Sequence, residues 1–373
     1  MKRRVEKVFR QLENPPDALL LANATDPFID SSFFYLFDVP SGLFEGSVAV
    51  AFPDGALHVY SSPLEAETAH QAAKDDPSVT IHVAPTSPAD PKSLERELAE
   101  LLRGVSRIGL NFRELTHEWY RRLDKMRPGT TWVDASAGFR KARVTKDAAE
   151  VERIRRAAEI GSRVGREIPG WLAEGITELE LAAQIEHAMM QAGASGRSFT
   201  TIVGFGPKSA EPHYYPQERR LASGDSIVCD FGAWYRRYAS DITRSFHFGR
   251  HDDEMARVHT TVEAAQAAAL EVIRPGVPGK EAHLAAARVI DASPWKGRFT
   301  HGLGHSVGLA VHDGYSMGPT TDDPLEEGMV VTVEPGIYLP GRGGVRIEDD
   351  ILVTKNGYEF LTTTPRGYLE VEA

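Results

Sequence analysis

Four carboxylates of this 373-residue chain stand in or beside apolar runs that are typical of β-strands. Asp230 and Asp241 lie eleven residues apart, and residues 232–238 between them have the length of a hairpin loop, so the two acids can face each other across adjacent strands. Glu334 and Glu348 occupy similar apolar runs. A buried carboxylate ion costs several kcal/mol unless it meets a cation or hydrogen-bond donors. A surface position on an edge strand explains any one of these acids, but the four together indicate a shared cation site.

Residues 301–312 form a glycine-rich segment that contains three histidines, His301, His305 and His312. Glycine lets the backbone approach a ligand closely, although richness in glycine and histidine alone is a weak signal. If one of these imidazoles joins the four carboxylates, their four negative charges balance two divalent cations. The residues therefore favour a dinuclear centre, and they leave open which histidine belongs to it.

The donor types point to the metal and to the reaction. Four carboxylates and one imidazole suit Mn²⁺, Co²⁺ or Fe²⁺, and Zn²⁺ also binds such sites. We expect two divalent ions, with manganese as the first choice. Two such ions acidify a bound water and polarise a carbonyl, which is the chemistry of hydrolysis.

The predicted elements of the chain fall into two groups, and the candidate site residues all lie in the second. Residues 1–136 alternate apolar runs with helical stretches, which predicts an N-terminal α/β domain without site chemistry of its own. The small and basic segment 137–146 predicts a linker. Residues 147–373 combine helices with strand-like runs joined by hairpin-length connections, which predicts an α+β domain with a mostly antiparallel sheet.

Two helices are predicted where the second domain begins. Thr145 precedes an acidic first turn that contains Asp147 and Glu150, which is typical of a helix start. A second helix is predicted over residues 177–192. The side chains of this second helix that we expect to face the core are Leu179, Leu181, Ile185 and Met189.

Composition and charge argue against several classes of function. A formal charge of −11 disfavours nucleic-acid binding, which depends on clustered Lys and Arg. No run approaches the roughly 20 apolar residues that a bilayer demands, and the N-terminus lacks the apolar run of a signal peptide, so we expect a soluble, cytoplasmic protein. Cys229 is the single cysteine, which excludes an internal disulfide; we interpret it as a buried side chain of a strand.

The candidate ligands and their motifs resemble those of the pita-bread metallopeptidases, the group that contains methionine aminopeptidase, aminopeptidase P and prolidase. The resemblance covers the whole chain in outline and is specific from about Thr145 onward. It implies a creatinase-like N-terminal domain followed by a curved, mostly antiparallel sheet covered by helices. Creatinase itself lacks the metal ligands, so the resemblance is to the peptidases. The ligands that it implies in this chain are Asp230, Asp241, His305, Glu334 and Glu348.

Proline-specific members of this group carry further histidines around the metals, and His213, His301 and His312 match them. The resemblance implies that these side chains bind the substrate or stabilise the tetrahedral intermediate. Arg346 matches an arginine near the site. Because it lies two residues before Glu348, the two side chains share one face of a strand, where the cation would help to hold that carboxylate ionised.

The chain departs from the pattern of the group at two places. Lys208 stands where an asparagine is usual, and residues 314–323 lack the usual arginine, which is suited to a substrate carboxylate or to polar contacts beyond proline. Arg342 is a candidate replacement for that arginine. A solvent-facing loop position explains Arg342 equally well.

The resemblance implies hydrolysis of Xaa-Pro bonds in small peptides with proline at the second position, with Glu334 as the general base. We expect an Xaa-Pro dipeptidase, or prolidase, that forms a homodimer. One alternative is an aminopeptidase P, which acts on longer peptides. Others are a non-catalytic member of the fold that binds peptide or protein partners, which the complete ligand set disfavours, and a metal-dependent lyase.

Overall fold

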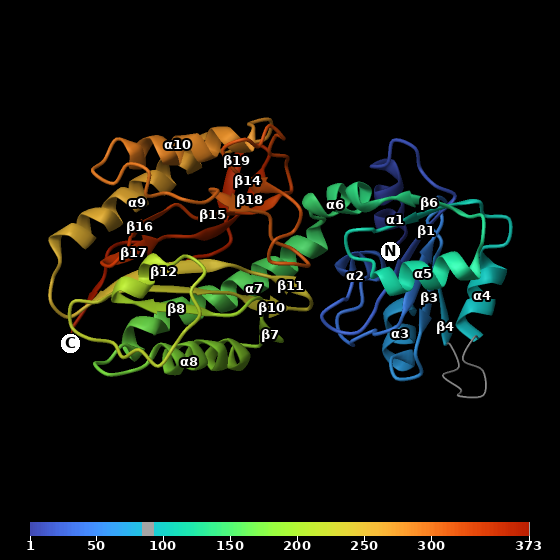
Figure 1. Cartoon of the computed structure of the whole chain (residues 1–373), viewed down its shortest axis with the longest axis horizontal. Coiled ribbons are helices and arrows are strands. Elements are labelled where there is room, and N and C mark those ends of the chain that lie inside the picture. The colour runs from blue at the N-terminus through green and yellow to red at the C-terminus, as the bar shows by residue number, and fades with distance from the viewer. Residues whose placement is uncertain (84–92, 373) are drawn as a thin grey trace. The chain divides into compact units, whose positions relative to one another are not determined.

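The structure is a computed structural model that describes residues 1–83 and 93–372. The chain divides into two compact units between Arg143 and Val144 (Figure 1). The segment 137–146, for which the sequence predicts a linker, is helical over most of its length because it belongs to α6 (Ser136–Val144).

The first unit is a mixed sheet with helices. Its remaining elements are α1 (Lys2–Arg10), β1 (Ala18–Ala22), α2 (Ser31–Phe37), β2 (Val48–Ala51), β3 (Leu57–Ser61), α3 (Ala66–Ala73), β4 (Val79–Val83), α4 (Ser93–Leu101), β5 (Arg107–Leu110), α5 (His117–Met126) and β6 (Thr131–Asp134). Among the described residues the strand order is β4-β3-β2-β1-β5-β6. The turn at residues 52–56 closes the hairpin of β2 and β3, and Gly55 in it has a φ of 92°.

The second unit holds all the candidate site residues. Its helices are α7 (Ala148–Glu167), η1 (Ile168–Trp171), α8 (Glu178–Gln191), η2 (Gly206–Ala210), α9 (Asp253–Val272) and α10 (Gly279–Asp291). Its strands are β7 (Gly196–Arg197), β8 (Ile202–Phe205), β9 (Ser226–Phe231), β10 (Ala233–Tyr235), β11 (Tyr238–Ala239), β12 (Ile242–Phe248), β13 (Gly304–His305), β14 (Ser316–Met317), β15 (Val330–Val333), β16 (Gly336–Leu339), β17 (Gly343–Arg346), β18 (Asp349–Thr354), β19 (Gly357–Phe360) and β20 (Glu370–Val371).

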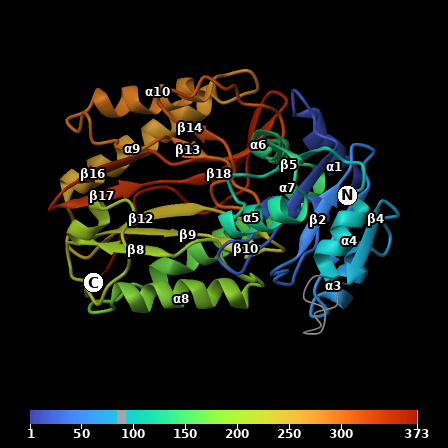
Figure 2. The ribbon, with the colours of Figure 1, turned by 45° about the vertical axis from the view of Figure 1, so that its right-hand side comes forward.

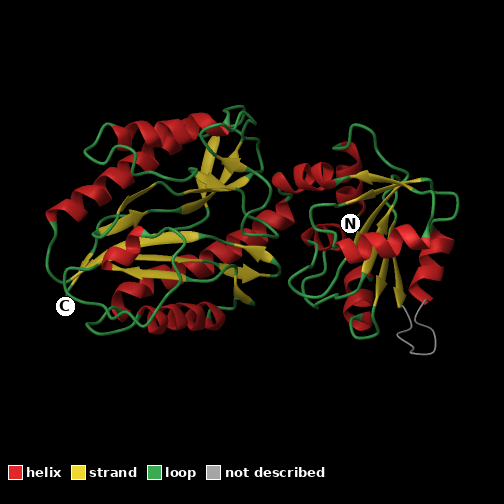
Figure 3. Cartoon of the chain, viewed as in Figure 1, coloured by secondary structure: helices red, strands yellow, loops and turns green. Residues whose placement is uncertain are grey.

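The strands of the second unit lie between two pairs of helices. Helices α7 and α8 lie on one side and α9 and α10 on the other, and two views agree on this arrangement (Figure 1 and Figure 2). In the part of the unit that is described, every strand pair is antiparallel except β12 with β20. Figure 3 shows the strands gathered in the interior of the unit. The predicted α+β architecture with mostly antiparallel strands is confirmed.

Two apolar cores hold the strands and helices of the second unit together. One lies among α7, α8 and strands β8 to β12, and it includes Phe205, Phe231 and the buried Cys229, as the sequence predicts for that cysteine. The other lies among α9, α10 and strands β15 to β18, and it includes Val331 and Ile347. Packing in the two cores fixes the positions of these strands, and with them the positions of the acidic residues that the strands carry.

Both predicted helices form, and each begins with a capping box. In α7 the side chains of Asp147 and Glu150 bond each other's backbone amides, and in α8 Thr177 and Glu180 do the same. Leu179, which we expected to face the core, is instead 47% exposed. The buried stripe of α8 contains Leu181, Ile185 and Met189, and a residue two positions before Leu181 lies about 200° around the helix from it.

Among residues 1–83 and 93–372, no helix is both long enough and apolar enough to cross a membrane.

Candidate metal centre

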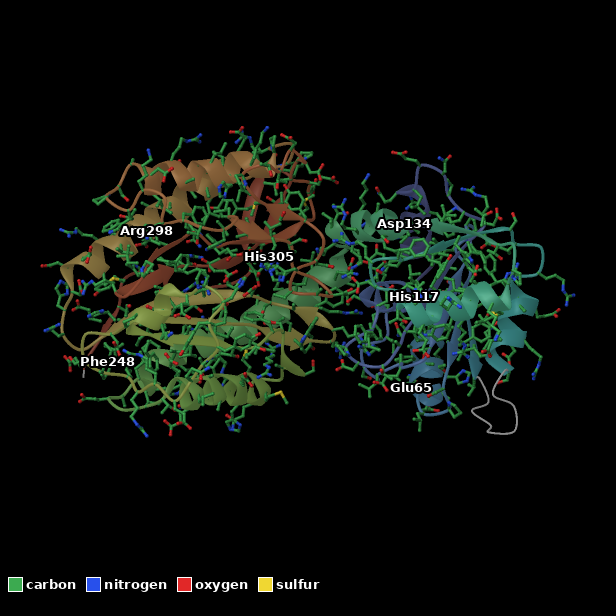
Figure 4. All side chains as sticks on the ribbon, viewed as in Figure 1. Glu65, His117, Asp134, Phe248, Arg298 and His305 are labelled. Atoms are coloured by element: carbon green, nitrogen blue, oxygen red, sulfur yellow. The ribbon has the colours of Figure 1, made fainter. Side chains whose placement is uncertain are left out.

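Three of the expected ligands converge from distant parts of the second unit. Asp241 lies just before β12, His305 ends β13, and Glu348 lies between β17 and β18. One potential ligand atom from each lies within 4.8 Å of the others. The Nε2 of His305 is 3.6 Å from Asp241 Oδ2 and 3.4 Å from Glu334 Oε1, which adds a fourth side chain. Figure 4 labels His305 in the interior of the unit.

The register of β9 and β12 places the fifth expected ligand. Asp230 in β9 is paired with Thr243 in β12, two residues beyond Asp241. The loop between the two strands is itself a small hairpin of β10 and β11, turned by Arg236 and Arg237 with φ values of 47° and 71°. The two aspartates therefore come from one β-hairpin, as their spacing predicts.

Two buried oxygens of this cluster are left without a donor, although Arg346 pairs with the other oxygen of Asp230. Oδ1 of Asp230 and Oδ1 of Asp241 are buried, and neither accepts a hydrogen bond from the described residues. Buried polar atoms are normally hydrogen-bonded, and an orphaned pair of carboxylate oxygens beside an imidazole is what a divalent cation binds. The residues present thus fit a metal centre.

The titration behaviour of the cluster agrees with this reading. Burial, together with repulsion from neighbouring carboxylates, raises the pKa of Asp241 and of Glu348 well above its ordinary value. Burial raises the pKa of Glu334 to about 8, against the opposing field of Arg346. Burial lowers the pKa of His305 to about 3, with His312 adding to the effect, so its imidazole is neutral, as a ligand must be.

A cavity of about 570 Å³ lies over the acids. Its wall includes all nine residues that the sequence singles out: Asp230, Asp241, His305, Glu334, Glu348, His213, His301, His312 and Arg346. Apolar side chains complete the wall, among them Phe199, Ile202, Pro212 and Val311. The cavity therefore combines an acidic floor with an apolar side.

Comparison with known proteins identifies the family. Residues 152–355 match the metallopeptidase family M24, and residues 12–145 match the creatinase/prolidase N-terminal domain. The chain belongs to metallopeptidase family M24. This family depends on two metal ions, and the acidic cluster lies inside the matched residues.

Relatives of this M24 chain come from curated proteins and from solved structures. An uncharacterized peptidase of Staphylococcus aureus (strain USA300) is 40% identical over 229 residues, which are 61% of this chain and 65% of the relative. The X-Pro aminopeptidase of Thermotoga maritima is similar in structure with a TM-score of 0.88 and 32% identity, over 99% of this chain and 100% of that one. The prolidase of Pyrococcus horikoshii has a TM-score of 0.86 and 31% identity, over 98% and 99% of the two chains.

Arg346 places a positively charged side chain at the M24 site, and each of its three guanidinium nitrogens donates a hydrogen bond. Its Nη2 donates to Asp230 Oδ2 at 2.7 Å, its Nη1 to the hydroxyl of Tyr338 at 2.9 Å, and its Nε to Thr243 Oγ1 at 3.0 Å. Its direct ion pair is with Asp230. Arg346 reaches Asp230 because β17 packs against β9. Burial and neighbouring acids raise the pKa of Glu348, and the charge of Arg346 opposes that rise, as their shared face of the strand predicts.

The three outer histidines have different surroundings. His301 Nδ1 donates to the carbonyl of Gly302 at 2.8 Å, and its Nε2 lies 2.8 Å from the hydroxyl of Tyr338. The ring of His312 packs 4.1 Å from that of His305, measured between centroids. His213 lies on the cavity wall in the loop after η2. His301 is thus fixed by hydrogen bonds, whereas His213 and His312 make none to the described residues.

Several residues that sequence reasoning missed hold the ligands in place. Thr243 Oγ1 donates to Glu348 at 2.6 Å, and Thr332 Oγ1 donates to Glu334 at 3.1 Å. Asp350 accepts the backbone N–H of Asp241 at 2.9 Å. A signal for these residues was present, because each lies two positions from a ligand and so shares its face of a strand or extended segment. Tyr338 had no comparable signal.

The two departures from the family pattern also have a place in the structure. Arg342 is 55% exposed and pairs with Asp252 at 2.9 Å and Glu254 at 3.0 Å, so its charge is used on the surface and not on the cavity wall. Lys208 pairs with Glu211 at 2.7 Å and lies over the ring of Tyr214 at 5.5 Å.

Proposed function

We propose that the second unit hydrolyses Xaa-Pro peptide bonds. The observation that carries the proposal is the single cavity that unites the acids with three histidines and an apolar wall. The similar structures named X-Pro aminopeptidase and prolidase support the same class of substrate. We propose as the ligands of two cations Asp230, Asp241, His305, Glu334 and Glu348.

We propose manganese as the native metal, since four carboxylates and one imidazole suit Mn²⁺, as they do Co²⁺ and Fe²⁺. When bound, two divalent cations supply Lewis acidity, which polarises a peptide carbonyl and acidifies water. The neutral imidazole of His305 and the orphaned oxygens of Asp230 and Asp241 are ready to hold them. The remaining chemistry falls to the side chains around these ligands.

Glu334 is proposed as the general base that takes the proton of the attacking water. Thr332 holds its Oε1, and Nδ1 of His301 lies 3.9 Å from its Oε2. Because the Gly302 carbonyl can only accept, the proton of His301 resides on Nδ1, and Nε2 accepts from the hydroxyl of Tyr338. These bonds fix the ring beside the base.

His213 and His312 are proposed as the groups that contact the substrate and stabilise the developing oxyanion. Both line the cavity, and neither ring is engaged by a hydrogen bond from the described residues. Contacts with the substrate would fix these N–H donors, which then stabilise the negative charge that develops on the oxyanion. The apolar residues Phe199, Ile202 and Pro212 offer contact surface to the proline ring or to the preceding side chain.

Peptide length separates two candidate functions, the dipeptidase and the aminopeptidase. A dipeptidase needs a cation for the free carboxylate next to proline. Of the residues that line the cavity, Arg346 carries the guanidinium, and Asp230, Tyr338 and Thr243 already occupy it. This observation favours the second candidate function, an aminopeptidase that acts on longer peptides. Rates on Ala-Pro and on Ala-Pro-Ala with Mn²⁺ decide between them, and the homodimer stays a prediction that gel filtration tests.

The variant Glu334→Gln tests the proposed reaction. We expect turnover of both peptides to be lost while the peptide still binds, because the amide cannot accept the proton of water. Glu327→Gln is the matched control, since Glu327 is exposed on the loop before β15. Metal content is measured in both variants. Turnover retained in the metal-loaded Glu334→Gln variant would contradict the assignment.

A further inference from the structure

The loop that carries His213 is tied down by one buried carboxylate. Glu178 is the first residue of α8 and is fully buried. Its Oε1 accepts the backbone N–H of Phe205 at 2.9 Å, just before η2. Its Oε2 accepts the hydroxyl of Tyr214 at 2.9 Å and the backbone N–H of Gln217 at 3.0 Å. The two ends of the loop therefore converge on a single side chain.

The charge of Glu178 is well placed to hold this loop. It stands in the first turn of a 14-residue helix, where the aligned backbone dipoles favour a negative charge. Hydrogen bonds to a carboxylate are stronger than those between neutral groups, and here three of them lie in a buried setting. The backbone adds two contacts, from Glu178 N–H to Arg219 and from Leu179 N–H to Gln217.

Tyr214 connects this carboxylate to the cavity. It directly follows His213, and its hydroxyl is the one side-chain donor that Glu178 receives from the described residues. On its other side Lys208, which replaces the usual asparagine, lies over the Tyr214 ring and pairs with Glu211. The imidazole of His213 makes no hydrogen bond of its own to the described residues, so its position depends on the backbone at Tyr214.

We propose that Tyr214, held by Glu178, is a positioning residue for His213. The proposal rests on the proposed function, in which His213 contacts the substrate. The bond between Tyr214 and Glu178 holds the loop so that His213 keeps its place on the cavity wall. Loss of this bond leaves the metal ligands in place but lets the imidazole move, and a displacement of about 1 Å can reduce a rate by roughly 100-fold.

A double-mutant cycle tests the proposal. Tyr214→Phe removes a single hydroxyl, and Tyr215→Phe is the matched control, because Tyr215 is the next residue and is 66% exposed. We expect Tyr214→Phe to lower kcat/KM between roughly 10-fold and 100-fold, to leave Mn²⁺ affinity unchanged, and to have no further effect in a His213→Ala background. Tyr215→Phe should leave kcat/KM unchanged.

Two results would overturn the proposal. One is an equal loss of kcat/KM from Tyr214→Phe with and without His213, because the tyrosine would then act independently of the histidine. The other is a Tyr214→Phe enzyme as active as the control. Amide hydrogen exchange of residues 206–217, measured without substrate, tests the loop separately and should rise in Tyr214→Phe alone. Wild-type enzyme that cleaves neither peptide would instead contradict the proposed function.

Discussion

Glu348 and Asp349 are adjacent in the chain, both are buried, and the protein treats their charges in opposite ways. Asp349 receives four hydrogen bonds, from Arg244 and Thr362 at 2.7 Å, from Gln266 at 2.9 Å and from Arg366 at 2.5 Å. Glu348 receives one through its side chain, from Thr243. Asp349 is therefore neutralised by two guanidinium groups, whereas Glu348 faces other acids.

This difference separates a structural carboxylate from one that awaits a cation. Behind the cavity the protein supplies its own positive charge, and the buried Arg244 also binds the carbonyl of Glu348 at 2.6 Å and that of Thr364 at 2.7 Å. In the cavity it supplies one guanidinium, that of Arg346, which pairs with Asp230 Oδ2, and Oδ1 of Asp230 and of Asp241 receive no hydrogen bond from the described residues. Arg244 and Arg366, here called the arginine cluster, thus fix the backbone next to the metal site.

The largest expected effect follows from Glu348→Gln. Loss of an outer partner of a metal ligand costs about 10–100-fold in affinity or activity, so loss of a ligand should cost more than roughly 100-fold. The metal-free protein should be as stable as wild type or more so, since one charge leaves a cluster of acids. Calorimetric Mn²⁺ titration and denaturant unfolding measure the two quantities. A large loss of stability without loss of Mn²⁺ binding would reverse the comparison.

Asp349→Asn should show the opposite pattern. Removal of one partner from a buried ion pair costs about 3–5 kcal/mol, because Arg244 would keep a buried charge with a weaker partner. We expect unfolding at a lower denaturant concentration, with Mn²⁺ binding by the folded protein within about tenfold of wild type, or about 1.4 kcal/mol. A variant as stable as wild type would show that the arginine cluster contributes nothing.

The metal-free protein should become less stable as pH rises. Burial raises the pKa of Glu334 from 4.5 to about 8, so between these values the native state binds more protons than the unfolded state. Stability is therefore greatest below pH 4.5 for this group and is lost as pH rises towards 8. Thermal unfolding with EDTA should show this slope; excess Mn²⁺ should flatten it, and Glu334→Gln should reduce it, because Asp241 and Glu348 also contribute. An identical slope with and without metal would contradict the prediction.

Arg342→Ala should have the smallest effect. Exposed ion pairs contribute about 0–1 kcal/mol, and Arg342 makes its two pairs on the surface. We expect an unchanged KM for Ala-Pro and a free energy of unfolding within about 0.5 kcal/mol of wild type. A KM raised tenfold for Ala-Pro, but not for Ala-Pro-Ala, would instead make Arg342 the group that binds a substrate carboxylate.

Much of the second unit could be predicted because its signals are local. The capping boxes of α7 and α8 mark both helix starts, and acids within apolar runs single out Asp230 and Glu334, both of which line the cavity. Leu179 was predicted wrongly, since its place around the helix, and not its apolar character, decides its burial. Tyr338, which links His301 to Arg346, gave no local signal because both contacts cross between segments.

By itself, the sequence determined which side chains can share a face of a strand, because that depends only on alternation along the chain. Residue types likewise determined the donor set and its preference for divalent cations. Only the tertiary structure decided that the Asp349 carboxylate pairs with two guanidinium groups, whereas the Glu348 carboxylate accepts a hydrogen bond from Thr243 alone among the described residues. Arg244 and Gln266 reach Asp349 from 105 and 83 residues away, and no local pattern records such a meeting. The same long-range packing decided that Arg346 pairs with Asp230.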